Sequence, residues 1–311
     1  ILGNGATEII FLFMEVVNPQ KVLIVSPTFG EYERAVKATE RVENSNILGN
    51  SDKKKDDENS CGKQKIKIEY FELKENDDFK LNIHNLKNEL AKKYDLLIIC
   101  NPNNPTGKFL KLDETEEILK ECNKYNTKLF VDEAFIDFLK DGMKESIINT
   151  KEDKQNLFVT RAFTKFFAIP GLRLGYGIGF DDEILKKMWE EKEPWTVNTF
   201  ANLAGLIMLD DKEYIEKSEK WILEEKKFMY KELNEFQYIN AYKTECNFIL
   251  IKVYNISSAS LKDKMIEKNI LIRDASNFKF LDYHFVRLAI KDRKSNLKML
   301  ELLADIMEYR G

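Results

Sequence analysis

Short apolar runs alternate with stretches of helical spacing along the first half of the chain. Residues 22–25, 96–100, 128–131 and 157–159 are continuous apolar runs, as expected of strands buried on both faces. Residues 115–125, between the second and third runs, have the spacing of an amphipathic helix. Strands that alternate with helices predict an α/β fold in which helices cover both faces of a mostly parallel sheet.

The pattern changes after about residue 198. Helices are predicted over residues 212–233, 260–268 and 295–308, and strands over residues 247–253, 270–273 and 285–290. We therefore expect a large domain over residues 1–200 and a smaller α/β domain over residues 201–311. Residues 46–64 have no apolar period and are rich in Asn, Ser, Asp, Glu and Lys, which predicts a flexible, solvated insertion in the large domain.

Composition and charge narrow the class of protein. The 311 residues carry 49 basic and 53 acidic side chains, and a net charge of −4 disfavours a nucleic-acid partner. No apolar run approaches the roughly 20 residues that span a bilayer. The apolar run at residues 9–14 lacks the basic flank of a signal peptide. Four dispersed cysteines indicate reduced thiols in a cytoplasmic protein, and two isolated histidines do not suggest a metal site.

The most informative candidate chemistry lies in residues 160–176, TRAFTKFFAIPGLRLGY. Lys165 follows Thr164, and Arg173 comes eight positions later. A lysine amine that is desolvated or close to other positive charge can form a Schiff base with an aldehyde. A hydroxyl and a guanidinium are groups that hold a phosphate. This combination predicts a pyridoxal-phosphate (PLP) site, and the alternative is a surface lysine in a loop.

Three further motifs occupy positions that such a site needs. Residues 3–8, GNGATE, precede a helix, and glycines with a helix N-terminus suit a phosphate. Residues 101–107, NPNNPTG, and residues 132–135, DEAF, each follow a predicted strand, where ligands bind in open α/β folds. An Asn could donate to a phenolate-like oxygen, and Asp132 could pair with a protonated pyridine nitrogen. The alternatives are an ordinary capped glycine loop for residues 3–8, a simple turn for residues 101–107 and a capping role for Asp132. The occurrence of all four motifs in one chain is not easily explained as coincidence.

From Gly3 to near its C-terminus, the chain resembles fold-type I PLP-dependent enzymes of the aminotransferase class I/II superfamily. It is similar to the histidinol-phosphate aminotransferase branch, and most similar to the threonine-phosphate decarboxylases of cobalamin biosynthesis. The closer match is carried by residues 3–8, 29–32, 132–138, 164–176 and 194–198. The resemblance implies a seven-stranded type of sheet between helices, a smaller C-terminal α/β domain and a homodimer.

The same resemblance implies how the site residues act. Lys165 would be the catalytic residue that attaches PLP covalently, Asp132 would pair with the pyridine nitrogen, and Asn104 would bond the phenolic oxygen. Arg287 would bind the substrate carboxylate through a bidentate fork, and Arg273 a second anionic group. For both arginines the alternative is a surface salt bridge. The remaining implied cofactor contacts are Phe29 on the ring face and Gly5, Ala6, Thr7, Thr164 and Arg173 around the phosphate.

The sequence departs from the family pattern in two places. Aminotransferases of this branch usually have tyrosine at the position of Phe135, and the decarboxylases have phenylalanine. The family also has several tens of residues before the glycine loop, which hold part of the small domain, substrate-phosphate contacts and an arm that crosses to the partner subunit. The chain begins at Ile1 without Met, so we expect it to lack that arm.

Three functions remain open from the sequence. The leading one is a lyase that decarboxylates O-phospho-L-threonine to (R)-1-amino-2-propanol phosphate for cobalamin biosynthesis. The second is an aminotransferase of the histidinol-phosphate type that passes an amino group to 2-oxoglutarate. The third is a non-catalytic module with the PLP fold, which Lys165, Asp132 and Asn104 argue against.

Overall fold

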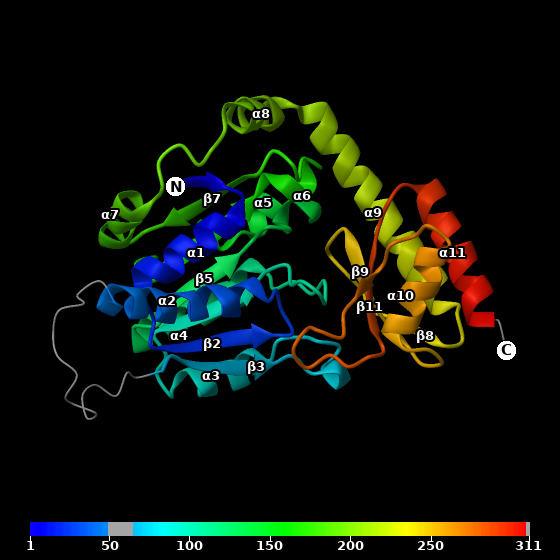
Figure 1. Cartoon of the computed structure of the whole chain (residues 1–311), viewed down its shortest axis with the longest axis horizontal. Helices are drawn as coiled ribbons and strands as arrows, with labels where there is room; N and C mark the ends of the chain where they lie inside the picture. Colours follow the sequence, from blue (N-terminus) through cyan, green and yellow to red (C-terminus); the bar gives the residue numbers. More distant parts are fainter. Residues whose placement is uncertain (49–64, 309–311) are drawn as a thin grey trace.

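The computed structural model describes residues 1–48 and 65–308, which fold around two sheets (Figure 1). The larger sheet has seven strands in the order β1-β7-β6-β5-β4-β2-β3. Strands β2 to β6 run parallel, and β7 is antiparallel to both of its neighbours. Its strands are β1 (Leu2–Asn4), β2 (Lys21–Ser26), β3 (Lys67–Glu72), β4 (Leu96–Cys100), β5 (Lys128–Asp132), β6 (Leu157–Ala162) and β7 (Leu174–Gly179).

Helices cover both faces of this sheet, which explains why its central strands are continuously apolar. Along β2, Val22 and Ile24 belong to the cluster packed under α1 (Ala6–Val17) and α2 (Glu31–Leu48). Leu23 and Val25 point the other way, into the cluster under α3 (Ile83–Leu90) and α4 (Leu112–Tyr125). Successive side chains of a strand face opposite sides, so a strand covered on both sides needs an apolar residue at every position.

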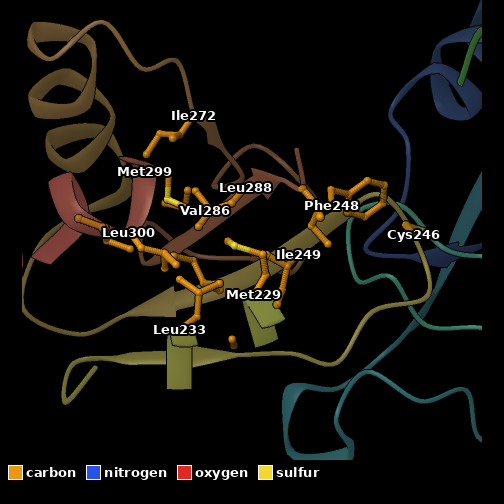
Figure 2. Close-up of a cluster of buried hydrophobic side chains, with 14 of the residues drawn as sticks. Met229, Leu233, Cys246, Phe248, Ile249, Ile272, Val286, Leu288, Met299 and Leu300 are labelled. Carbon is orange, nitrogen blue, oxygen red and sulfur yellow. The ribbon is translucent and has the colours of Figure 1, made fainter. Parts of the chain in front are cut away.

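The smaller sheet has four antiparallel strands in the order β10-β11-β9-β8. These are β8 (Ile239–Ala241), β9 (Phe248–Val253), β10 (Arg273–Asp274) and β11 (Phe285–Ala289). Helices α9 (Lys212–Asn234), α10 (Ser258–Glu267) and α11 (Arg293–Glu308) accompany it. Figure 2 shows how Met229 and Leu233 of α9, Ile249 of β9 and Met299 of α11 converge into one buried core.

Shorter elements connect these parts. They are α5 (Gly142–Glu145), α6 (Phe163–Phe166), α7 (Asp182–Glu191), α8 (Thr199–Asp210) and the single-turn helices at Glu75–Asp77, Ile136–Phe138 and Ile147–Asn149. An aromatic cluster joins the two sheets, because the Phe79 ring lies 4.9 Å from that of Tyr242 and 5.9 Å from that of Phe285. Beside it, the Lys252 ammonium donates to Glu75 at 2.7 Å. These ring contacts and this ion pair therefore connect the two sheets along one side.

The α/β fold, with a mostly parallel seven-stranded sheet and a smaller C-terminal α/β part, is confirmed. The strand predicted over residues 270–273 is wrong in extent, since only Arg273–Asp274 pairs as β10. Of the insertion predicted over residues 46–64, residues 46–48 belong to α2 and residues 49–64 lie outside the described part. The domain boundary at residue 200 stays a prediction. In the described ranges, no helix is long and apolar enough to cross a membrane.

Candidate active site

A cavity of about 1030 Å³ lies between the two sheets. Ser26, Cys100 and Asp132, the last residues of β2, β4 and β5, line it. The small-sheet side contributes Phe248 of β9 and Arg287 of β11. The cavity therefore occupies the carboxyl edge of the parallel strands, where parallel α/β sheets bind ligands.

Lys165 lies on α6, the single turn that follows β6, and its side chain reaches the cavity. The amine is accessible through the cavity, yet protein atoms surround it closely enough for desolvation to lower its pKa. Asp132 opposes this shift, whereas Arg287 and Arg173 add to it. The Lys165 Nζ atom stands 5.7 Å from the centre of the Phe135 ring. A lysine with a lowered pKa more readily supplies the neutral amine that attacks a carbonyl.

Asp132 is buried at the end of β5, and both of its carboxylate oxygens accept hydrogen bonds. The Tyr32 hydroxyl donates to Oδ2 at 2.6 Å, and the Ala134 backbone N–H donates to Oδ1 at 2.9 Å. Burial raises the pKa of Asp132, and these two donors and Lys165 act in the opposite direction. The carboxylate is thus fixed in orientation while it faces a cavity that holds several cations.

A cradle for an anion forms where the N-terminus of α1 meets Arg173. Ala6 and Thr7 line the cavity from the first turn of α1, and Thr164 and Arg173 face them. Gly5 has a φ of 80°, and a Cβ there would fall 2.3 Å from Nη2 of Arg173. Only glycine therefore allows the guanidinium to approach the loop so closely. The free N–H groups of a helix N-terminus, a hydroxyl and a guanidinium suit a phosphate.

Arg287 and Arg273 occupy opposite positions on neighbouring strands. The antiparallel register of β10 and β11 pairs them directly, and both line the cavity. Like charges directly opposite each other in a sheet are destabilising. Arg287 also donates a short hydrogen bond to Oδ1 of Asn104, and its guanidinium lies 4.7 Å from the Phe248 ring centre. These contacts fix Arg287, whereas Arg273 is exposed and bonds Asn277 at 3.1 Å.

The cavity has an excess of cationic side chains. Six line it: Lys165, Arg173, Lys262, Arg273, Lys279 and Arg287. Within the described ranges, none of the six forms a salt bridge. Four carboxylates also line it: Glu31 and Glu33 are paired with Arg34 and Lys37 on α2, Asp132 accepts from Tyr32, and Asp274 accepts from the Ser276 N–H. A site of this charge is suited to a ligand with several negative groups.

The structure brings the predicted site residues together. All line the cavity except Gly5, which lies against Arg173 at its edge. Sequence reasoning assigned no role to Tyr32, Phe248, Lys262 or Lys279. The FGEY segment was a signal for Tyr32, since it lies at the start of α2 only three residues after Phe29, another cavity residue. Nothing in the local sequence distinguishes Lys262 and Lys279 from the many other lysines.

Comparisons with known proteins agree with this geometry. The profile of the family described as Aminotransferase class I and II matches residues 58–303. A provisionally named threonine-phosphate decarboxylase of Caldanaerobacter subterraneus subsp. tengcongensis is 39% identical over 99% of this chain and 77% of its own length. The threonine-phosphate decarboxylase of Salmonella typhimurium is 31% identical over 99% of this chain and 76% of its own length.

A solved structure is similar along nearly the whole chain as well. The histidinol-phosphate aminotransferase from Clostridium acetobutylicum superposes with a TM-score of 0.85 and 34% identity, over 99% of this chain and 83% of that one. The buried Asp132, the cradle at Gly5 and the unpaired cations fit the pyridine nitrogen and the phosphate of PLP. The protein belongs to the aminotransferase class I and II family and is a PLP-dependent enzyme.

Proposed function

We propose that this enzyme decarboxylates O-phospho-L-threonine to (R)-1-amino-2-propanol phosphate, a reaction that serves cobalamin biosynthesis. The observation that carries the proposal is Phe135, whose phenyl ring lies in the cavity wall 5.7 Å from the Lys165 amine. Aminotransferases that this chain resembles usually present a phenol there. Two relatives named as threonine-phosphate decarboxylases, at 39% and 31% identity, support the same choice.

The proposed roles follow from the contacts. PLP supplies an aldehyde for covalent attachment and a ring that withdraws electrons from the substrate's alpha carbon. Lys165 would hold the cofactor through its amine and later deliver a proton to the alpha carbon. Asp132, fixed by Tyr32, would accept the hydrogen bond of the ring nitrogen. The phosphate would lie in the cradle of Gly5, Ala6, Thr7, Thr164 and Arg173, with Phe29 against the ring.

Arg287 would bind the substrate carboxylate. Because it also donates to Asn104, which would bond the cofactor's phenolic oxygen, the positions of the substrate and the cofactor would depend on each other. Decarboxylation breaks the bond between the carboxylate and the alpha carbon, releases CO₂ and leaves the electron pair to be protonated. Arg287 would hold the carboxylate in either reaction, and the orientation in which the site holds the substrate would set which bond at the alpha carbon is aligned for cleavage. Correct positioning can be worth about 7–11 kcal/mol of the barrier.

The direct test incubates the protein with PLP and O-phospho-L-threonine and measures CO₂ and aminopropanol phosphate. We expect both products in equal amounts. A parallel incubation supplies histidinol phosphate and 2-oxoglutarate and measures glutamate. Glutamate without CO₂ would overturn the proposal and favour the aminotransferase alternative, which the 34% identity to a solved histidinol-phosphate aminotransferase keeps as the second candidate.

We also propose that the enzyme is a homodimer and that α8 lies in the interface. Figure 1 shows α8 at the top edge of the molecule. Its residues Phe200, Leu203, Leu206 and Ile207 are each more than half exposed, and Trp195 just before the helix is almost fully exposed. A contiguous apolar patch of this kind is typical of a protein–protein interface. A second copy is the occupant we favour because proteins of this family are generally dimeric.

Replacing Leu206 with glutamate is expected to shift the protein toward monomer, because the new charge would have to be desolvated in an apolar contact. Sedimentation at several concentrations measures the shift. The matched control is Leu297→Glu, which places the same charge at an exposed leucine of α11 and should leave the mass unchanged. A wild-type protein that stays monomeric at all concentrations would refute the interface.

A further inference from the structure

We propose that Tyr214 is a positioning residue for Lys165, and that its hydroxyl holds the turn that carries the lysine. The inference rests on the proposed role of Lys165 as the residue that attaches PLP. Tyr214 lies on α9 and Lys165 on α6. Figure 1 shows α9 running from α8 to the small sheet. The contact therefore links a helix of the small sheet to the lysine that follows β6 of the large one.

The backbone carbonyl of Phe166, the residue after Lys165, needs a hydrogen-bond donor from outside its own turn. In a continuing helix the donor would be the N–H four residues later, but that residue is Pro170, which has no N–H. The Tyr214 hydroxyl donates to this carbonyl at 2.8 Å. Phe166 is buried, and an unpaired buried carbonyl is costly, so the bond stabilises the end of α6.

The turn itself is short and its own hydrogen bonds are long. α6 spans only Phe163–Phe166, and the N–H groups of Phe167 and Ala168 close it with hydrogen bonds of 3.4 and 3.3 Å. These exceed the usual range of about 2.7–3.2 Å. Ala168 has a φ of 52°, which a residue with a Cβ adopts at a cost. A single turn is not stable alone, so contacts from elsewhere in the fold must fix the direction of Lys165.

Tyr214 is held in place by its own helix and by two rings. Its backbone N–H donates to the Asp211 carboxylate at 2.9 Å, which caps the start of α9. Its ring stacks 5.7 Å from the Phe167 ring and lies 6.1 Å from the Phe166 ring in an edge-on arrangement. Met229 of the same helix packs in the core of the small sheet (Figure 2). The position of that sheet is therefore coupled to the position of the lysine turn.

The orientation of α6 decides the surroundings of the Lys165 amine. Protein atoms that exclude water lower the pKa of this amine. Asp132 opposes the shift, and the cations Arg287 and Arg173 add to it. A turn released from Tyr214 would let the amine move toward solvent, and its pKa would rise toward the ordinary value. The hydroxyl therefore helps to keep Lys165 as the neutral amine that reacts with an aldehyde.

The test compares wild type with Tyr214→Phe, which keeps both ring contacts and removes only the hydroxyl. Amine labelling of the full chain freed of PLP is followed against pH by mass spectrometry of the peptide around residue 165. We expect the labelling midpoint to move to higher pH, because the pKa of Lys165 rises. In the PLP-loaded enzyme, turnover of the substrate that wild type accepts should fall about two- to tenfold, as for loss of one hydrogen bond, with KM within about twofold.

The matched control is Tyr230→Phe, which removes the hydroxyl of an exposed tyrosine on the same helix and should leave midpoint and turnover unchanged. Tyr214→Leu removes the ring contacts as well, and its midpoint should move further. An unchanged midpoint in Tyr214→Phe would overturn the positioning role even if turnover fell. The reason is that partial misfolding lowers the amount of active enzyme without changing the pKa of Lys165 in the remainder.

These outcomes are separable from those that test the proposed function. Labelling of the PLP-free chain requires no reaction, and Lys165 would take part in decarboxylation and in amino transfer alike. A PLP adduct on another lysine would refute the role of Lys165, while the midpoint would still report whether Tyr214 positions its turn. An enzyme that releases no CO₂ and yet shows the shift refutes only the decarboxylase.

Discussion

Alanine in place of Lys165 is expected to remove the covalent link to the cofactor and to lower turnover by at least roughly 10²–10⁴-fold, the range for loss of a proton-transferring group. The amine would be lost from a position where burial and two arginines lower its pKa. Asp132 and Arg173 remain, so the variant should still bind PLP without attaching it. Borohydride reduction followed by mass spectrometry of the peptide around residue 165 measures the link, and product formation measures turnover.

The control for this variant is Lys144→Ala, which removes an exposed lysine on α5 and should leave both readouts unchanged. A Lys165→Ala protein that still gives a cofactor–peptide adduct after reduction would show that another lysine attaches PLP. Retention of more than about a tenth of wild-type turnover would contradict the proton-transfer role.

Alanine in place of Glu133 is expected to lower the free energy of unfolding by about 3–5 kcal/mol, as for breaking a buried ion pair. Oε2 of Glu133 accepts from Arg161 at 2.8 and 3.0 Å and from the Ser146 hydroxyl at 2.6 Å. Its Oε1 accepts from the Ile147 N–H at 3.0 Å. Both Glu133 and Arg161 are 1% exposed, so the truncation leaves a buried cation and two unpaired donors.

Urea unfolding of wild type and variant measures the loss. Glu213→Ala serves as the control because Glu213 and Lys217 form an exposed pair on α9, and it should cost at most about 0.5 kcal/mol. Replacing both buried partners, as Glu133→Met with Arg161→Met, should recover much of the stability, since the unpaired charge is then gone. A loss below about 1 kcal/mol for Glu133→Ala would mean that the pair is not desolvated as the structure indicates.

The parts of the fold that could be predicted are those that leave a local pattern. Strands β2, β4, β5 and β6 are buried on both faces, so they read as apolar runs. Strand β7 gives no such signal because three of its six residues are glycine. The structure explains why one of these residues is glycine. A Cβ on Gly175 would lie 2.3 Å from the Ala6 nitrogen, so any side chain at this position would collide with the start of α1.

Long-range pairing explains what escaped prediction in the site. Tyr32 is 100 residues from the Asp132 that it holds, and Arg287 is 183 residues from Asn104. The direct opposition of Arg273 and Arg287 depends on the register of two strands separated by a ten-residue loop region, residues 275–284, without periodic signal. The lack of salt bridges on the cavity cations could not be anticipated either, because lysines and carboxylates are spread along the entire chain.

The sequence by itself determined the alternation of strands and helices and the family, and it predicted which residues surround PLP. Most of those residues lie in or beside the loops that follow a strand or lead into a helix, and such positions are marked by local composition. Only the tertiary structure decided which donors orient Asp132, how Arg273 opposes Arg287 and which lysines reach the cavity. The reason is physical: hydrophobic period and turn residues act over a few positions, whereas the site's charge arrangement arises where segments far apart in the sequence pack together.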